Sequence, residues 1–139
     1  MEILLIEDNQ GDIFLFNMFF NKLGIGAKLT VLKDGASALE YLSESRLKKD
    51  EEIPGLIVLD VNLPDQSGFE ILSQIRDNQH LFNETKIIMF TSSSEDGDKL
   101  RAKQLGAYDF FTKPIDISEY EEAVRLICYM GYNTHRAVV

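Results

Sequence analysis

The segment Leu56–Asp60 (LIVLD) is an uninterrupted run of aliphatic residues that ends in an acidic one. The segment Ile3–Ile6 (ILLI) has the same character and is followed directly by Glu7 and Asp8. Aliphatic runs without polar alternation are typical of strands that are buried on both faces of a parallel sheet. The two segments therefore predict central strands of an α/β protein.

Three further strands are predicted outward from this pair, at Lys28–Leu32, Lys86–Phe90 and Tyr108–Phe111. Between successive strands, and again after the last one, apolar residues recur at the spacing of an amphipathic helix. Strand and helix thus alternate along the whole chain. This order predicts an α/β fold in which a five-stranded parallel sheet carries five helices, distributed over both of its faces.

The length of 139 residues suits a single domain. We expect this domain to cover residues 1–131, with Gly131 at the end of the last helix and residues 132–139 as a C-terminal tail. A net charge of -9 disfavours binding to nucleic acid. No apolar run approaches the ~20 residues of a transmembrane span, and the chain begins directly with a predicted strand, so we expect a cytoplasmic protein without membrane contact.

Polar residues follow four of the predicted strands. In an open parallel sheet the carboxyl ends of the strands form one edge, where ligands bind. Two carboxylates ~5 Å apart repel each other by roughly 3 kcal/mol at an effective dielectric constant of ~20, so an acidic cluster at this edge calls for a cation. Oxygen ligands that include the backbone carbonyl of Asn62 favour Mg²⁺. The residues that should meet there are Glu7, Asp8, Asp60, Thr91, Lys113 and Pro114, and the predicted metal ligands among them are Glu7, Asp8 and Asp60.

The same residue types suit phosphoryl transfer to a carboxylate. A phosphoryl group in transfer spreads negative charge over its oxygens, which a metal ion and cationic or hydroxyl donors stabilise. We predict Asp60 as the nucleophile. Lys113 would pair with one phosphoryl oxygen and the hydroxyl of Thr91 with another, while the metal binds a third.

These residues, in their order and spacing, resemble those of the receiver domains of bacterial two-component response regulators. The resemblance rests on the fragments Glu7-Asp8-Asn9, VLDVNLPDQSG around Asp60, MFTSS around Thr91, and Lys113-Pro114 after GAYDFF, and it covers nearly the whole chain. It implies a doubly wound, flavodoxin-like sheet in the order 2-1-3-4-5. It also implies a catalytic Mg²⁺ held by Asp8, Asp60 and the Asn62 carbonyl, with Glu7 acting largely through water, and a cis peptide bond before Pro114.

The resemblance further implies how the signal leaves the site. Thr91 would move toward the phosphoryl group, and Phe110, three residues before Lys113, would act as the aromatic switch residue. The remodelled surface would comprise the fourth helix (about Asp96 to Leu105), the fifth strand and the fifth helix (about Ser118 to Met130). Core packing is an equally good explanation of Phe110.

A stand-alone receiver of this kind would act through other proteins. The implied partners are a sensor histidine kinase as phosphoryl donor, a downstream phosphotransfer protein, or a second copy bound through the fifth-helix face. The fragment IEDNQGDIFLF, with Asp12 opening the first helix, and the long acidic and basic loop before PGLIVLDVNLP resemble regulators that serve bacterial phytochrome kinases. For Asp12, a favourable position in the first turn of a helix explains the residue equally well.

Three other functions are compatible with parts of this pattern. A flavin-binding electron carrier needs a Gly/Ser/Thr-rich phosphate loop, whereas Glu7 and Asp8 would repel that phosphate. A Mg²⁺-dependent phosphatase usually carries a D-x-D motif, and this chain has Asp60-Val61-Asn62, so we expect no turnover of an external substrate. The third alternative is a pseudo-receiver, an interaction module that works without phosphate. The presence of every key position weighs against it.

Overall fold

The computed structural model describes residues 1–45, 53–77, 82, 84–92 and 94–136. Residues 46–52 of the expected polar loop and residues 137–139 of the expected tail lie outside this description.

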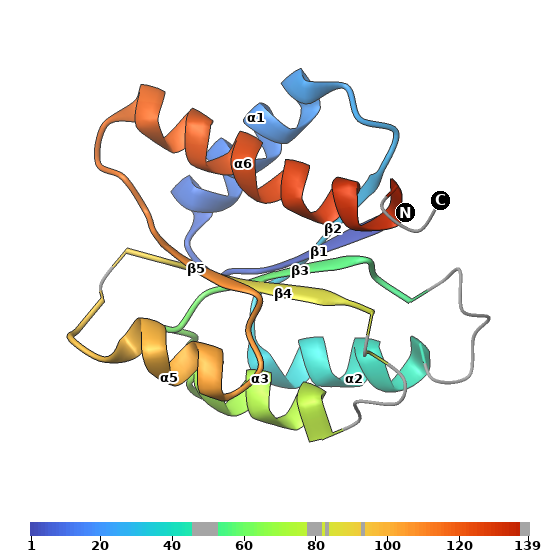
Figure 1. Ribbon diagram of the computed structural model, residues 1–139, viewed down its shortest axis with the longest axis vertical. Coiled ribbons are helices and arrows are strands. Elements are labelled where there is room, and N and C mark those ends of the chain that lie inside the picture. Colours follow the sequence, from blue (N-terminus) through green and yellow to red (C-terminus); the bar gives the residue numbers. More distant parts are fainter. Residues whose placement is uncertain (46–52, 78–81, 83, 93, 137–139) are drawn as a thin grey trace.

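Five strands and five helices alternate through the described residues, and the strands form one parallel sheet in the order β2-β1-β3-β4-β5 (Figure 1). This confirms the predicted fold and strand order. The strands are β1 (Glu2–Ile6), β2 (Lys28–Leu32), β3 (Leu56–Leu59), β4 (Lys86–Thr91) and β5 (Asp109–Thr112). The helices are α1 (Gln10–Leu23), α2 (Gly35–Ser45), α3 (Gly68–Asp77), α5 (Asp98–Gln104) and α6 (Ile117–Arg136).

Two helix layers enclose the sheet, with α1 and α6 on one face and α2, α3 and α5 on the other (Figure 1). Successive side chains of a strand point to opposite faces, so a strand covered on both sides must be apolar throughout. In β1, Ile3 and Leu5 pack with α1 and α6, whereas Leu4 and Ile6 pack toward α2 and α3. The uninterrupted aliphatic runs of the sequence follow from this arrangement.

Helix α6 is 20 residues long and continues past Gly131 to Arg136. The prediction that Gly131 ends the last helix is therefore wrong. A Cβ atom at Gly131 would lie 2.7 Å from Cδ2 of Leu56, so the glycine allows α6 to pass close to β3. Neither α6 nor any other helix of the described residues is long and apolar enough to cross a membrane.

Arg76, near the end of α3, joins three segments at the end of the sheet where the strands begin. Its guanidinium donates hydrogen bonds to the backbone carbonyls of Gly106 (3.0 Å), Phe82 (2.8 Å) and Thr85 (2.9 Å). The fixed fork of guanidinium donors suits several acceptors at once. Arg76 thereby connects α3 to the segment before β4 and to the turn before β5.

Candidate functional site

Three carboxylates meet where β1 and β3 end. The two strands are paired in register up to Ile6 and Leu59, so the residues that follow them lie side by side. Glu7 and Asp60 are buried, Asp8 is exposed, and one carboxylate oxygen of each lies within 4.8 Å of the others. The structure thus brings together the three acidic residues that the sequence predicted as metal ligands.

Lys113 enters this cluster from the end of β5. Its ammonium nitrogen lies 2.5 Å from Oε1 of Glu7, 3.2 Å from Oδ2 of Asp60 and 3.0 Å from Oδ2 of Asp12. The lysine side chain is only 4% exposed, so these carboxylates replace nearly all of the water that would otherwise solvate its charge. The predicted meeting of Lys113 with the acidic cluster is therefore present, with Asp12 as an additional partner.

Burial and charge together shift the protonation equilibria of this cluster. Burial raises the pKa of Glu7 to about 7, and the negative charge of Asp60 acts in the same direction, although the hydrogen bond from Lys113 opposes both. Burial by itself would lower the pKa of Lys113, but its hydrogen bond to Glu7 and the carboxylate charges outweigh this, and the pKa is raised. Lys113 is therefore cationic at neutral pH, and the Glu7 carboxyl is partly protonated there.

The turn between β1 and α1 fixes Glu7 and Asp12. The backbone amide of Asn9 donates to Oε2 of Glu7 (3.0 Å). Asn9 is also the N-cap of α1, since its Oδ1 accepts a hydrogen bond from the backbone amide of Asp12 (3.0 Å). This cap orients the first turn of α1 so that Asp12 faces Lys113.

Asp12 and Tyr120 are the site residues whose contacts the sequence did not reveal. The hydroxyl of Tyr120, on α6, donates to Oδ1 of Asp12 at 2.9 Å. Asp12 was ambiguous between a favourable first-turn residue and a partner contact, and Tyr120 lies in the predicted fifth helix (about Ser118 to Met130) without a role of its own in the prediction. The two residues are 108 positions apart, so only the three-dimensional packing of α1 against α6 brings them together.

The loop between β3 and α3 holds the backbone around Asp60. The amide of Gly68 donates to the carbonyl of Val61 (2.7 Å), and the amide of Asn62 donates to Oδ1 of Asp60 (3.2 Å). A Cβ atom at Gly68 would lie 2.1 Å from the backbone oxygen of Asp60, which leaves no room for any side chain. The loop therefore closes tightly and presents the carboxylate of Asp60 toward Lys113.

Thr91 and Phe110 lie in the neighbouring strands. Thr91 is the last residue of β4 and is fully buried, and its carbonyl accepts a hydrogen bond from the backbone amide of Lys113 (2.7 Å). Phe110 is a buried residue of β5 in the cluster that faces α5. Their switching roles remain predictions. Thr91 contacts the backbone of Lys113, and Phe110 lies in the strand that directly precedes Lys113.

The prediction of a cis peptide bond before Pro114 is wrong. The described residues contain no cis peptide bond, and they include Lys113 and Pro114. The trans form is the lower-energy isomer of an X–Pro bond by about 0.5–1 kcal/mol. Lys113 reaches the carboxylates from the trans backbone, so its contacts do not require the cis form.

Known proteins share this fold and sequence pattern. The chain is 32% identical over 135 residues to the probable methanogenesis regulatory protein FilR2 of Methanothrix harundinacea, covering 94% of this chain and 84% of FilR2. It is 30% identical over 123 residues to the response regulator Rcp1 of Synechocystis, covering 88% of this chain and 83% of Rcp1.

Solved structures agree with these relatives. The Mn²⁺-bound form of Rcp1 superposes with a TM-score of 0.80 at 29% identity, covering 91% of this chain and 90% of that one. The phosphorylated cyanobacterial phytochrome response regulator RcpA gives a TM-score of 0.80 at 27% identity, covering 91% and 89%. Residues 3–125 match the response regulator receiver domain family. The chain therefore belongs to the family of response-regulator receiver domains, a family of two-component signalling proteins.

Proposed function

We propose that Asp60 accepts a phosphoryl group from a sensor histidine kinase in a Mg²⁺-dependent reaction. The observation that carries this proposal is the meeting of Glu7, Asp8, Asp60 and Lys113 at one edge of the sheet. Asp60 is the central member of this group. One of its oxygens accepts from the amide of Asn62 and the other from Lys113, so both are held in fixed directions.

The acidic cluster suits a divalent cation. Carboxylate oxygens from Glu7, Asp8 and Asp60 converge without enough positive charge to balance them, and such hard oxygen ligands favour Mg²⁺. The Mn²⁺-bound form of Rcp1 supports a divalent site in this fold. When bound, the cation would neutralise charge on the phosphoryl oxygens. The Asn62 carbonyl is proposed as a further ligand.

The protein's own groups would perform the remaining tasks. A carboxylate oxygen of Asp60 attacks the phosphorus, a new P–O bond forms, and the bond between phosphorus and the kinase histidine breaks, with the electron pair leaving on the imidazole. Lys113 pairs with one phosphoryl oxygen and the hydroxyl of Thr91 with another. Hydrolysis of the resulting acyl phosphate would return Asp60 to its starting state.

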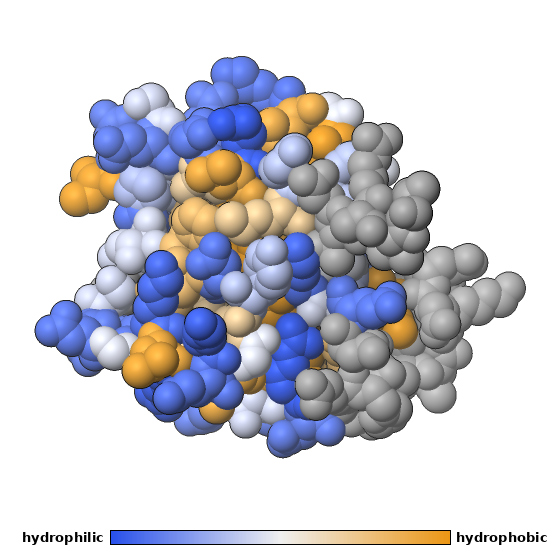
Figure 2. All heavy atoms as spheres, in the orientation of Figure 1, coloured by the Kyte–Doolittle hydropathy of each residue, from blue (hydrophilic) through white to orange (hydrophobic). Residues whose placement is uncertain are grey.

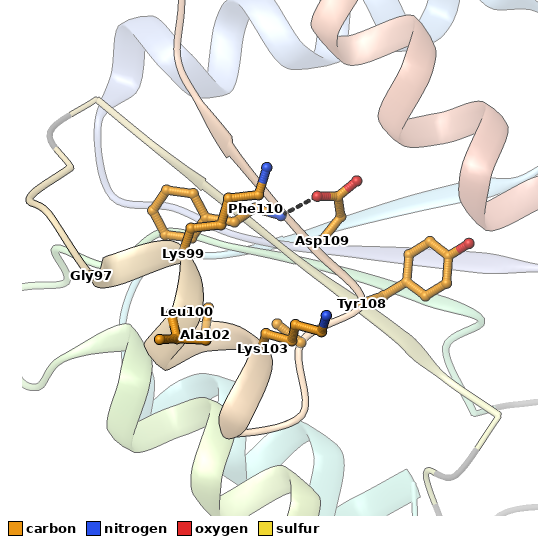
Figure 3. Close-up of a pocket in the computed structure, with 9 residues that line it drawn as sticks. Gly97, Lys99, Leu100, Ala102, Lys103, Tyr108, Asp109 and Phe110 are labelled. Carbon is orange, nitrogen blue, oxygen red and sulfur yellow. Dashed lines mark hydrogen bonds between the residues drawn. The ribbon is translucent and has the colours of Figure 1, made fainter.

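The surface formed by α5, β5 and α6 is proposed as the output surface. It faces the viewer in Figures 1 and 2, and Figure 2 shows hydrophobic atoms gathered between the two helix layers. A cavity of about 430 Å³ lies between α5 and β5. Figure 3 shows Phe110 and Lys99 at one end of it and Tyr108 at the other. Space beside Phe110 would allow its ring to change position when Thr91 moves toward the phosphoryl group.

Partners are proposed from the relatives and from this surface. RcpA is a phytochrome response regulator, which supports a phytochrome-type kinase as the donor. Tyr108 is 54% exposed on the β5 side, and Tyr129 is 59% exposed on α6. Exposed aromatic side chains of this kind favour a protein interface, either with a second copy of the chain or with a downstream phosphotransfer protein.

Intact-mass measurement after incubation with acetyl phosphate and Mg²⁺ tests the proposal. The wild type should gain ~80 Da, the mass of one phosphoryl group. Asp60→Asn and wild type in EDTA should not. Asp77→Asn, which removes an exposed carboxylate at the end of α3, is the matched control and should gain the adduct as wild type does. A wild type that gains no adduct would support the pseudo-receiver alternative instead.

A further inference from the structure

Asp12 makes two contacts that the proposed phosphoryl transfer does not require. Its Oδ2 accepts a hydrogen bond from Nζ of Lys113 at 3.0 Å, and its Oδ1 accepts one from the hydroxyl of Tyr120 at 2.9 Å. The Asp12 side chain is 20% exposed and the Lys113 side chain 4%. Asp12 therefore links the buried lysine of the site to helix α6 from the solvent side.

Tyr120 is held rigidly enough to orient Asp12. It is 3% exposed, and its ring packs against Phe90 and Phe19, with centroid separations of 5.3 and 6.3 Å. Aromatic packing of this kind fixes the ring plane and hence the direction of the hydroxyl. Because the Asp12 carboxylate is partly exposed, the hydroxyl of Tyr120, together with the ammonium of Lys113, keeps it directed inward.

The charges of the site make Asp12 a competitor for Lys113. Four carboxylates (Glu7, Asp8, Asp12 and Asp60) surround the site, and Lys113 is the cation that contacts three of them. An incoming phosphoryl group adds further negative charge and needs the same ammonium. Asp12 is not one of the three carboxylates that converge to bind a metal ion. A bound cation would therefore not neutralise the Asp12 charge directly, and this charge repels the incoming phosphoryl group.

We propose that Asp12 is a positioning residue that draws Lys113 away from the incoming phosphoryl group, and that Tyr120 holds Asp12 in this position. The pair would then limit how readily Asp60 is phosphorylated. This inference rests on the proposed function of Asp60.

The test is a double-mutant cycle on the rate of adduct formation with acetyl phosphate at saturating Mg²⁺, followed by intact mass. Asp12→Asn keeps the shape of the side chain and removes its charge, so the rate should rise roughly tenfold. Tyr120→Phe lets Asp12 turn toward solvent, and the rate should rise by about threefold. In the Asp12→Asn background, Tyr120→Phe should give no further increase, because the charge it positions is absent.

Two controls separate this role from packing of α1 against α6. Glu121→Gln removes the surface ion pair that Glu121 makes with Lys22 of α1 (2.8 Å), and Glu122→Gln removes an exposed ion pair with Arg125 of the same helix. Both should phosphorylate at the wild-type rate. The advantage of Asp12→Asn should also shrink as salt is raised, since charge effects at a partly exposed group are screened.

Binding of beryllofluoride, followed by ¹⁹F NMR, gives a second measurement that involves no reaction. Asp12→Asn should bind this phosphoryl mimic several-fold more tightly than wild type. Circular dichroism melts would establish that each variant is folded.

The outcomes are distinct. A rate for Asp12→Asn equal to or below that of wild type overturns the inference, as does an equal effect of Tyr120→Phe in both backgrounds. A wild type that forms no adduct on Asp60 refutes the proposed function and removes this inference with it.

Discussion

Both edges of the sheet bury charged side chains, but they compensate them in different ways. At the edge where the strands begin, which we call the amino edge, the Glu2 carboxylate accepts hydrogen bonds from the hydroxyls of Thr30 (2.5 Å) and Tyr41. Arg76 at the same edge donates to three backbone carbonyls. Glu2 and Arg76 thus form their hydrogen bonds with neutral groups that the protein itself supplies.

At the edge where the strands end, which we call the carboxyl edge, like charges are brought together instead. Glu7, Asp8 and Asp60 converge, and among the residues that the structure describes Lys113 is the one cation paired with Glu7, Asp60 and Asp12. Clustered carboxylates raise each other's free energy unless a cation is near. The amino edge is therefore built for stability, whereas the carboxyl edge is left short of positive charge and is built to receive a cation.

The largest test of this comparison is Arg76→Met. The variant keeps much of the aliphatic stem but leaves three backbone carbonyls without their donors, two of them on the buried residues Phe82 and Thr85, so it should lower the free energy of unfolding by about 4 kcal/mol. Urea unfolding would measure the change. Arg125→Met, which breaks an exposed pair with Glu122 on α6, should leave the free energy of unfolding close to that of wild type, because exposed ion pairs are screened by solvent. Similar losses in the two variants would contradict a structural role specific to Arg76.

The next test concerns the pH dependence that Glu7 confers in the absence of metal. The pKa of Glu7 is about 7 in the folded protein, whereas its ordinary value is 4.5. Between pH 4.5 and pH 7 the folded state therefore binds more protons than the unfolded state. Stability should therefore fall as pH rises from about 4.5 to 7, by about 2–3 kcal/mol from this residue. Below pH 4.5 Glu7 is protonated in both states, so its contribution to stability is fully present, and above pH 7 the loss is complete.

Glu7→Gln should remove this part of the pH profile in urea unfolding carried out in EDTA. Glu70→Gln, at an exposed position of α3, is the matched control and should follow the wild-type profile. If the stability of Glu7→Gln changed with pH in parallel with that of wild type across pH 4.5–7, ionisation of Glu7 would have no cost in folding free energy, and the carboxyl edge would not be short of positive charge.

These first tests bear on what the sequence could predict. The carboxyl edge was predictable because Glu7, Asp60, Thr91 and Lys113 each lie at the end of a strand or directly after it, and parallel strands end at one edge. The amino edge was not, because Arg76 binds backbone carbonyls, which every residue type carries and no side-chain pattern marks.

Interpretation of the local sequence pattern was also incomplete or wrong at residues whose main contact lies far away in the sequence. Gly131 looks like a helix terminator, yet it makes room for Leu56 of β3. Asp12 looks like a first-turn residue, yet it binds Lys113 and Tyr120. In each case the deciding partner lies far away in sequence, so the local pattern carries no trace of it.

Metal binding should stabilise the carboxyl edge directly. At pH 7.5, Mg²⁺ at about ten times its dissociation constant should stabilise the wild type by about 1.4 kcal/mol. Asp8→Asn relieves repulsion in the cluster, so the metal-free variant should be slightly more stable than wild type and should gain little from Mg²⁺. Asp77→Asn should respond to Mg²⁺ as wild type does. Equal stabilisation of Asp8→Asn and wild type would exclude Asp8 as a ligand.

The smallest expected effect belongs to the amino edge again. Tyr41→Phe removes one of the two hydroxyls that donate to the Glu2 carboxylate, which is only 9% exposed as a residue. Because Thr30 still donates, the free energy of unfolding should fall by about 1 kcal/mol rather than by the full cost of a bare buried charge. Tyr129→Phe, at an exposed tyrosine of α6, should change the free energy of unfolding by less than about 0.3 kcal/mol.

Mg²⁺ should stabilise Tyr41→Phe and wild type equally, since the Glu2 carboxylate at the amino edge already has hydrogen-bond donors from the protein. A Mg²⁺ response that changes with Tyr41 would mean that the two edges are coupled and that their division into a structural and a functional edge is wrong.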